Sequence, residues 1–327
     1  MKTLSLLISV ILAGLADAQT APSPYGWPIW THKGEVKPKS SLVYNPTNEI
    51  IFPALFNAGA YLANPLGQWY MYYAPHDAPG GVALMYADSI EGPWTEYENN
   101  PVISNQWGDY YNVSHVSSPH PIWNNEAGRV FVYFHGENNV TRWAETDNGY
   151  DFDYGGAAVT NRMGGPRVTE SSYARVFTHT NPLSKYKYAM FYMANEVDGR
   201  RRIRLAESID GRAWTVSPKR VLWGGTEEGH SLSGANLIKY RNVLYLIYHG
   251  SSGKIYARSV DRTLRKINAT PIVLYSASGE ATDIGRSAAP HMVRANGKWY
   301  LFYESGARSQ TTIMWAKANT CYLTKCV

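Results

Sequence analysis

Trp299-Tyr-Leu-Phe-Tyr303 is the last of five short aromatic segments that recur along the 327-residue chain. Each segment is rich in aromatic or β-branched residues and is bounded by glycine, asparagine or charged residues, which is typical of β-strands. The spacing of roughly 60 residues indicates a repeated structural unit. The five copies are Trp69-Tyr-Met-Tyr-Tyr73, Phe131-Val-Tyr-Phe134, Tyr188-Ala-Met-Phe-Tyr192, Leu244-Tyr-Leu-Ile-Tyr248 and Trp299-Tyr-Leu-Phe-Tyr303.

Further strand-like segments accompany each copy. The segments that precede the copies are Phe56–Tyr61, Ser117–Trp123, Ser171–Phe177, Ser233–Ile238 and Ala288–Val293. A third segment follows, clearest in Ala87–Trp94 and Ala206–Trp214, where Ser-x-Asp/Glu-Gly-x-Trp predicts a tight turn before an aromatic residue of the outer strand. With a fourth strand partly visible, five such units predict an all-β, single-domain, five-bladed β-propeller. A β-sandwich with accidental similarity is the rival interpretation.

Composition agrees with a folded β protein and limits the partners. Aromatic residues make up 13% of the chain and charged residues 17%, which excludes a disordered or highly charged scaffold. The formal net charge of +5 is mild, and no Lys/Arg run of the nucleic-acid-binding type is present. We therefore expect no nucleic-acid partner, and the positive charge is compatible with an acidic ligand.

The first residues predict export. Lys2 precedes an apolar run, and Ala16-Asp-Ala18 offers small residues for cleavage, so residues 1–18 are expected to be a signal peptide and residues 19–327 the propeller. The run is too short to span a bilayer and no later segment resembles a transmembrane helix. We expect a secreted, extracellular monomer that does not bind membranes.

Two kinds of sequence feature fit an oxidising compartment. Cys321 and Cys326 are expected to form a small terminal disulfide. N-glycosylation triplets begin at Asn112, Asn139 and Asn268.

The topology of a propeller predicts where a ligand binds. The innermost strands start, and the second strands end, at the same face around the central axis, where ligands of propellers usually lie. The second strands are expected to end at Ala74, His135, Met193, His249 and Glu304. The inner strands are expected to start near Asn57, His115, Thr169/Glu170, His230 and Arg286.

This face is rich in histidine. It is expected to hold His76, His115, His135, His230, His249, Arg286 and Tyr173. A lone histidine at a strand end is more often a surface or hydrogen-bonded residue, but five of the nine histidines at one face indicate a functional site. His120 and His291, at equivalent mid-strand positions, are expected to pack between blades.

A secreted five-bladed propeller first suggests glycosidases of the arabinanase and xylosidase type, whose chemistry needs two carboxylates. The carboxylates expected near the face are Asp77, Glu170, Asp283 and Glu304, with no convincing pair. Histidine, tyrosine and arginine suit β-elimination of a uronic acid polysaccharide instead. That reaction needs the sugar carboxylate neutralised, a base for the C5 proton and an acid for the leaving oxygen.

One stretch carries a family resemblance. Ser114-His115-Val-Ser-Ser-Pro-His-Pro-Ile-Trp123, with His135 in Tyr-Phe-His-Gly-Glu-Asn, resembles the paired-histidine motif of β-propeller polysaccharide lyases, such as ulvan lyases and rhamnose–glucuronate lyases. Ser171–Arg175 and Arg200–Arg204 are similar to their tyrosine and arginine elements, although those lyases have seven blades.

The resemblance implies roles for individual residues. His115 and His135 would bind or protonate around the scissile bond, and Tyr173 would act as the base and is also a candidate for the acid. Arg204, Arg202 or Arg286 would neutralise the carboxylate, whereas Tyr188 with Arg204 is an alternative pair. The other residues expected to bind substrate are His230, His249, Asn57, His76 and Glu304.

The sequence thus predicts a lyase for an acidic polysaccharide or oligosaccharide, with a glycoside hydrolase and a non-catalytic lectin as alternatives. No cofactor is expected for the chemistry. A structural calcium or zinc ion is compatible with the sequence, although no His-x-x-x-His or Cys-x-x-Cys motif is present.

Overall fold

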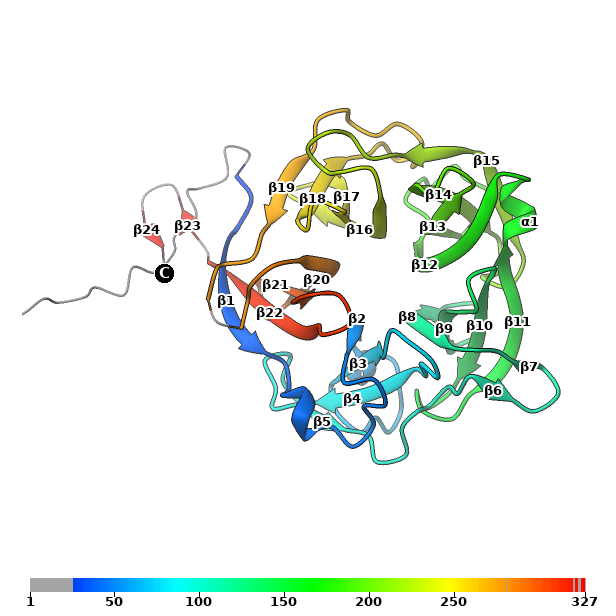
Figure 1. Ribbon diagram of the computed structural model, residues 1–327, viewed down its shortest axis with the longest axis horizontal. Coiled ribbons are helices and arrows are strands. Elements are labelled where there is room, and N and C mark those ends of the chain that lie inside the picture. Colours follow the sequence, from blue (N-terminus) through cyan, green and yellow to red (C-terminus); the bar gives the residue numbers. More distant parts are fainter. Residues whose placement is uncertain (1–25, 281, 320, 323–324, 327) are drawn as a thin grey trace, which may run out of the picture.

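The computed structural model describes residues 26–280, 282–319, 321–322 and 325–326. Five four-stranded antiparallel sheets surround a central axis like the blades of a propeller, which confirms the predicted fold (Figure 1). The predicted signal peptide lies outside the described residues. Within them, no helix combines the length and the hydropathy needed to cross a membrane.

Each blade is a meander whose first strand lies closest to the axis (Figure 1). The first blade contains β2 (Ile51–Phe56), β3 (Trp69–Ala74), β4 (Ala83–Ala87) and β5 (Thr95–Glu96). The second contains β8 (Val116–Asn124), β9 (Arg129–Gly136), β10 (Val140–Thr146) and β11 (Asp153–Thr160). The third contains β12 (Val168–Thr178), β13 (Tyr188–Glu196), β14 (Arg201–Ser208) and β15 (Trp214–Leu222).

The last two blades follow the same order. The fourth contains β16 (Leu232–Tyr240), β17 (Val243–Gly250), β18 (Ile255–Ser259) and β19 (Ile272–Tyr275). The fifth contains β20 (Ser287–Ala295), β21 (Lys298–Ser305), β22 (Thr312–Asn319) and, as its outermost strand, β1 (Ile29–Glu35). The short elements are η1 (Lys39–Ser41), η2 (Ala58–Ala60), α1 (Asn161–Gly164) and the hairpins β6 (Gln106–Trp107) with β7 (Tyr111–Asn112) and β23 (Cys321–Tyr322) with β24 (Lys325–Cys326).

The ring is closed by pairing the two ends of the domain. Strand β1 runs antiparallel to β22, with Ile29 opposite Asn319, so the fifth blade is built from both ends (Figure 1). Trp30 is buried in the core between the fourth and fifth blades. Closure therefore removes an open sheet edge and covers apolar surface at the same time.

Every inner strand carries a bulge at the same place. The register against the second strand shifts there, and one residue of each bulge has a left-handed backbone conformation. These residues and their φ angles are Phe52 (56°), Ser118 (52°), Tyr173 (55°), Gly234 (64°) and Ala289 (42°). The bulges therefore align the five blades residue by residue.

The alignment of the bulges shows that the predicted inner strand of the first blade was wrong. Its inner strand is β2, and the predicted segment Phe56–Tyr61 begins at the last residue of β2 and continues into η2. The uniformly buried run of β2 lacks the Ser-Ser or Ala-Ala pair that marks three other inner strands. Pro53 could have identified β2 as the inner strand, because it follows the bulge residue as Pro119 and Pro290 do in the second and fifth blades.

The predicted outer turns are confirmed. Ser208 Oγ accepts hydrogen bonds from the N–H groups of Asp210 and Gly211, and Trp214 follows as the first residue of β15. The Trp214 ring packs edge-on against Tyr133 of the second blade, with ring centroids 5.7 Å apart. The tryptophan after each such turn therefore anchors an outer strand to the neighbouring blade.

The terminal disulfide prediction concerns side chains outside the described part of the chain. The backbone of β23 places Cys321 opposite Cys326 of β24. No disulfide is seen in the part that the structure describes.

Trp30→Ala is expected to lower the free energy of unfolding by about 3 kcal/mol, because it removes a large buried side chain from the closing strand. Urea unfolding followed by circular dichroism measures the change. Trp223→Ala is the matched control, since Trp223 is 60% exposed, and should change stability by less than about 0.5 kcal/mol. Equal effects of the two substitutions would contradict the role given to β1.

Candidate active site

The strand register places the predicted second-strand ends at one face of the ring. Each is opposite the residue before a bulge, and the pairs are Ile51 with Ala74, Ser117 with His135, Ser172 with Met193, Ser233 with His249 and Ala288 with Glu304. The residues three positions before the bulges are Glu49, His115, Glu170, Ser231 and Arg286. Of Thr169 and Glu170, the two residues predicted at the start of the third inner strand, Glu170 is therefore the one that reaches this face. In the first blade the equivalent residue is Glu49, and the prediction of Asn57 was wrong.

An aromatic pair closes the axis beneath this face. The rings of Phe52 and Tyr173, from the bulges of the first and third blades, stack with centroids 4.4 Å apart. Ala289 and Met193 complete this small apolar cluster. Tyr173 is 7% exposed, and burial raises the pKa of its hydroxyl.

Two histidines of the second blade meet Tyr173. The His115 and His135 rings have centroids 5.3 Å apart, and His135 is also 5.3 Å from the Tyr173 ring, edge to face. Nδ1 of His135 shares a hydrogen bond of 2.5 Å with Ser118 Oγ. Burial lowers the pKa of His135 well below 6.5 and also lowers that of His115, so both rings are neutral at pH 7.

The other predicted histidines differ in their surroundings. Nδ1 of His249 accepts a hydrogen bond from the Ala289 N–H at 3.1 Å, and burial lowers its pKa well below 6.5. The half-buried His76 lies 2.7 Å from Asp77 and close enough to His115 to lower its pKa. His230 is exposed in the loop before β16, and no described hydrogen bond joins it to the other four.

Three buried glutamates from three blades also reach this face. Glu304 is 2% exposed and Arg286 Nη2 lies 2.5 Å from its Oε2. Burial raises the pKa of Glu304, and the negative charge of Glu49 raises it further, whereas Arg286 lowers it. Two carboxylates and a guanidinium thus share the side of the site between the fifth and first blades.

Glu49 and Glu170 have different partners. Oε1 of Glu49 accepts a hydrogen bond of 2.6 Å from Thr311 Oγ1, while its buried Oε2 has no partner in the described part of the chain. Glu170 accepts a hydrogen bond of 2.8 Å from Ser172 Oγ and lies 3.8 Å from the guanidinium of Arg201. The face therefore offers three carboxylates in three electrostatic environments.

The arginine predictions are partly corrected. Arg286 reaches the site, but Arg202 is held by Asp198 at 2.6 Å, and Arg204 is bound to Glu196 at 3.1 Å. Arg201 takes the place predicted for them, since its guanidinium lies over the Tyr173 ring at 5.6 Å. Alternation along β14 could have separated Arg201 from its neighbour, because successive residues of a strand face opposite sides.

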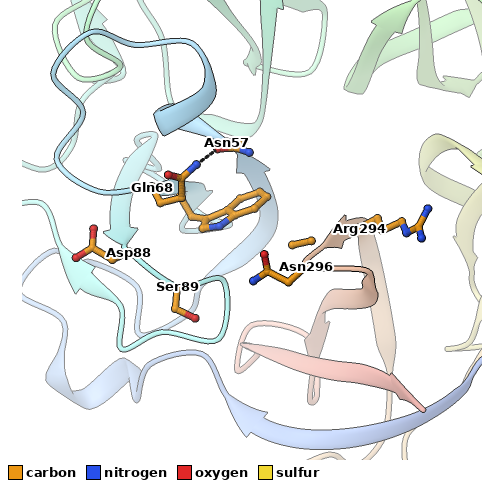
Figure 2. Close-up of a pocket in the computed structure, with 8 residues that line it drawn as sticks. Asn57, Gln68, Asp88, Ser89, Arg294 and Asn296 are labelled. Atoms are coloured by element: carbon orange, nitrogen blue, oxygen red, sulfur yellow. Dashed lines mark hydrogen bonds between the residues drawn. The ribbon is translucent and has the colours of Figure 1, made fainter. Parts of the chain in front are cut away.

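Three other residues lie away from the site. Asn57 follows the far end of β2 and hydrogen-bonds Gln68 there (Figure 2). Asp283, itself fully buried in the loop before β20, accepts hydrogen bonds from Tyr275 and Ser305. Tyr188, at the start of β13, donates a hydrogen bond to Glu126, so its pairing with Arg204 in a site is ruled out.

The contacts of His120 confirm that it packs between blades, below the Phe52–Tyr173 pair. Its Nδ1 accepts a hydrogen bond of 3.1 Å from the Val176 N–H of the third blade. The rings of His120 and His291 have centroids 6.0 Å apart. Arg175, fully buried beside them, donates to the Pro119 carbonyl, and burial lowers its pKa to about 9.

The candidate glycan and metal sites can be placed as well. Asn112, Asn139 and Asn268 are all exposed, and their glycosylation remains a prediction. Among the described residues, no group of three or more His, Cys, Asp or Glu side chains is arranged to hold a metal ion.

The fold is similar to that of solved sugar-cleaving enzymes. An α-L-arabinofuranosidase from Lactobacillus brevis superimposes with a TM-score of 0.62 at 13% identity, over 85% of this chain and 93% of that one. A family-43 β-xylosidase/α-arabinofuranosidase from a compost microbial metagenome, described in complex with xylotriose in a calcium-free form, gives 0.59 at 16% identity, over 92% and 98%. A sucrose-6-phosphate hydrolase from Lactobacillus gasseri gives 0.62 at 16% identity, over 95% and 64%.

No protein-family model matches the chain, and no curated protein matches it. At 13–16% identity these structural relatives establish the propeller fold. Their names describe glycosidases and hydrolases, which makes the polysaccharide lyase prediction wrong, together with its β-elimination chemistry and uronic acid substrate. The resemblance to polysaccharide lyases rested on His115 and His135. In the structure these two histidines share their face with buried glutamates, so they do not by themselves indicate a lyase.

The buried histidines predict acid destabilisation. His135 stays neutral in the folded chain, whereas the unfolded chain protonates it near pH 6.5, so the unfolded state binds more protons below that pH. Its contribution to stability is complete above pH 6.5 and is lost as the pH falls. His135→Gln should reduce the slope of unfolding free energy between pH 6 and 5 by about 1.4 kcal/mol per pH unit.

Urea unfolding at several pH values measures that slope. His230→Gln is the control because His230 is exposed, and it should leave the slope unchanged. An unchanged slope in His135→Gln would show that His135 is not kept neutral by the fold.

Proposed function

We propose that the chain is a glycoside hydrolase that cleaves a plant or microbial oligosaccharide or polysaccharide at the face formed by Glu49, Glu170 and Glu304. The observation that carries the proposal is the convergence of these three buried carboxylates in unlike electrostatic environments. Carboxyl groups with different neighbours are suited to paired acid and base roles. The propeller fold shared with arabinofuranosidases and xylosidases supports the same reaction class.

Glu304 is assigned as the general acid. Its pKa is raised mainly by burial and additionally by Glu49, so it holds a proton to a higher pH than an exposed glutamate. In the proposed reaction this proton passes to the glycosidic oxygen as the bond to the anomeric carbon breaks.

Glu170 is assigned as the general base. Its carboxylate accepts a hydrogen bond from the Ser172 hydroxyl and lies near the Arg201 guanidinium. It removes a proton from the attacking water, whose oxygen bonds to the anomeric carbon, so that one water is consumed for each bond cleaved. Glu49, with one free buried oxygen, supports Glu304 and can accept a hydrogen bond from a sugar hydroxyl.

The neutral side chains of the face complete the assignment. His115 and His135 are uncharged at pH 7 and can donate or accept hydrogen bonds to sugar hydroxyls. Tyr173 and Phe52 form an apolar floor under the site. The chemistry needs no cofactor, because two carboxylates and water suffice. Secretion and a monomeric state remain part of the proposal.

Glu304→Gln and Glu170→Gln are expected to lower kcat by about a hundredfold or more, because each removes a proton-transfer group while keeping the shape of the side chain. Release of reducing ends from arabinose- and xylose-containing polysaccharides measures the loss. Asp77→Asn, an exposed carboxylate beside the same face, is the control and should keep near wild-type activity.

Thermal unfolding of each variant should show an intact fold. Full activity of both glutamine variants would reject the assignment. A product with the ultraviolet absorbance of an unsaturated uronate would reject hydrolysis itself.

The raised pKa of Glu304 also predicts the pH profile. A general acid works only when protonated, so the alkaline side of the kcat/KM profile reports the pKa of Glu304. Arg286 lowers that pKa, and Arg286→Met should therefore move the alkaline side of the profile to higher pH. Arg202→Met is the control because Arg202 pairs with Asp198 away from the site. A downward shift, or none, would contradict the role of Glu304.

A further inference from the structure

A recess lies at the end of the propeller opposite the three glutamates. It has a volume of about 470 Å³ between the first and fifth blades, and its lining includes Asn57, Gln68, Trp69, Asp88, Arg294 and Asn296 (Figure 2). The proposed catalytic residue Glu49 precedes β2, whereas Asn57 follows it. At about 3.3 Å per residue, β2 separates the two ends by roughly 20 Å.

The lining is suited to uncharged polar ligands. Three amide side chains contribute both donors and acceptors, and Asp88 and Arg294 carry opposite charges. Gln68 Nε2 donates to Asn57 Oδ1, which orients the two amides (Figure 2). The side-chain N–H donors of Asn57 and the side-chain oxygen of Gln68 remain for other partners. A volume of this size is within the range of ligand pockets.

An exposed aromatic stack adjoins the same end of β2. Tyr61 directly follows η2, the turn that begins after Asn57. The Gly59 N–H of that turn donates to the backbone carbonyl of Gln68 at 3.1 Å. The Tyr61 ring is 49% exposed and stacks on Trp123 of the second blade with centroids 5.1 Å apart. The Phe56 ring also stacks on Tyr61, with centroids 5.5 Å apart.

Aromatic rings and amides bind different parts of a sugar chain. The flat apolar face of a ring packs against sugar C–H groups, and amide groups pair with hydroxyls. Tyr61 costs free energy to leave exposed, yet its orientation is maintained by two stacked neighbours. The recess and the stack are joined through η2, so one extended chain could contact both.

We propose that this end of the propeller binds an uncharged glycan chain, with sugar hydroxyls in the recess and a sugar ring on Tyr61. The site is separate from the three glutamates and goes beyond the proposed hydrolase activity, because it would bind glycan whether or not the chain cleaves it. A polymer held here would remain attached while the other face acts on a chain.

Native affinity electrophoresis in gels that contain soluble arabinoxylan or debranched arabinan tests the proposal. Glu304→Gln serves as the background, so that the polysaccharide in the gel is not cleaved. We expect retardation of this protein, and an increase of about fivefold in the apparent Kd on adding Tyr61→Ala or Asn296→Ala. Tyr110→Ala is the matched control, because Tyr110 is a 64% exposed tyrosine on another hairpin and should leave the Kd unchanged.

The outcomes separate this site from the hydrolase. Retardation that Tyr61→Ala and Asn296→Ala both leave unchanged would overturn the proposal, as would the absence of retardation in both gels. Stronger retardation by polygalacturonate would overturn the uncharged ligand class. Retardation of the Glu304→Gln protein, together with no release of reducing ends by the wild-type chain, would support this site and reject the proposed hydrolase. In the otherwise wild-type chain, Tyr61→Ala should hydrolyse small aryl glycosides at an unchanged rate.

Discussion

The bulge in each inner strand is the constraint on which the rest of the molecule depends. Four of the five bulge residues are not glycine, and a left-handed conformation costs such a residue about 1–2 kcal/mol. In two of the blades the cost is offset by the stacking of the bulge residues Phe52 and Tyr173. The same shift in register brings the second-strand ends, among them His135 and Glu304, to the face above that stack.

The charged groups of this face are stable because each is paired or hydrogen-bonded across elements. Arg286 neutralises part of the charge on Glu304, and Ser172 and Arg201 satisfy Glu170. Glu49 is the exception, since one of its oxygens is buried without a described partner. Burial by the propeller therefore raises the pKa of the proposed acid, Glu304.

Aromatic repeats were enough to predict the fold, because each blade core needs the same kind of strand and the copies remain similar. Second-strand ends such as His249 and Glu304 were predictable for the same reason. The inner strand of the first blade was not, since it carries Ile51-Phe52 where other blades have small residues, and Glu49 was missed with it. Arg201 was missed because adjacent arginines differ only in the side of the strand that they face.

The reaction class was the wrong part of the prediction. Glu170 and Glu304 were expected at the face but not as a pair, and the structure adds Glu49 beside Glu304, so that three buried carboxylates support the proposed hydrolysis. Cleavage of a susceptible polysaccharide in water enriched in ¹⁸O, followed by mass spectrometry of the products, separates the two reactions most directly. Hydrolysis predicts one ¹⁸O atom incorporated for each bond broken, within the saturated fragments. Unlabelled fragments with an unsaturated terminal sugar would contradict the account.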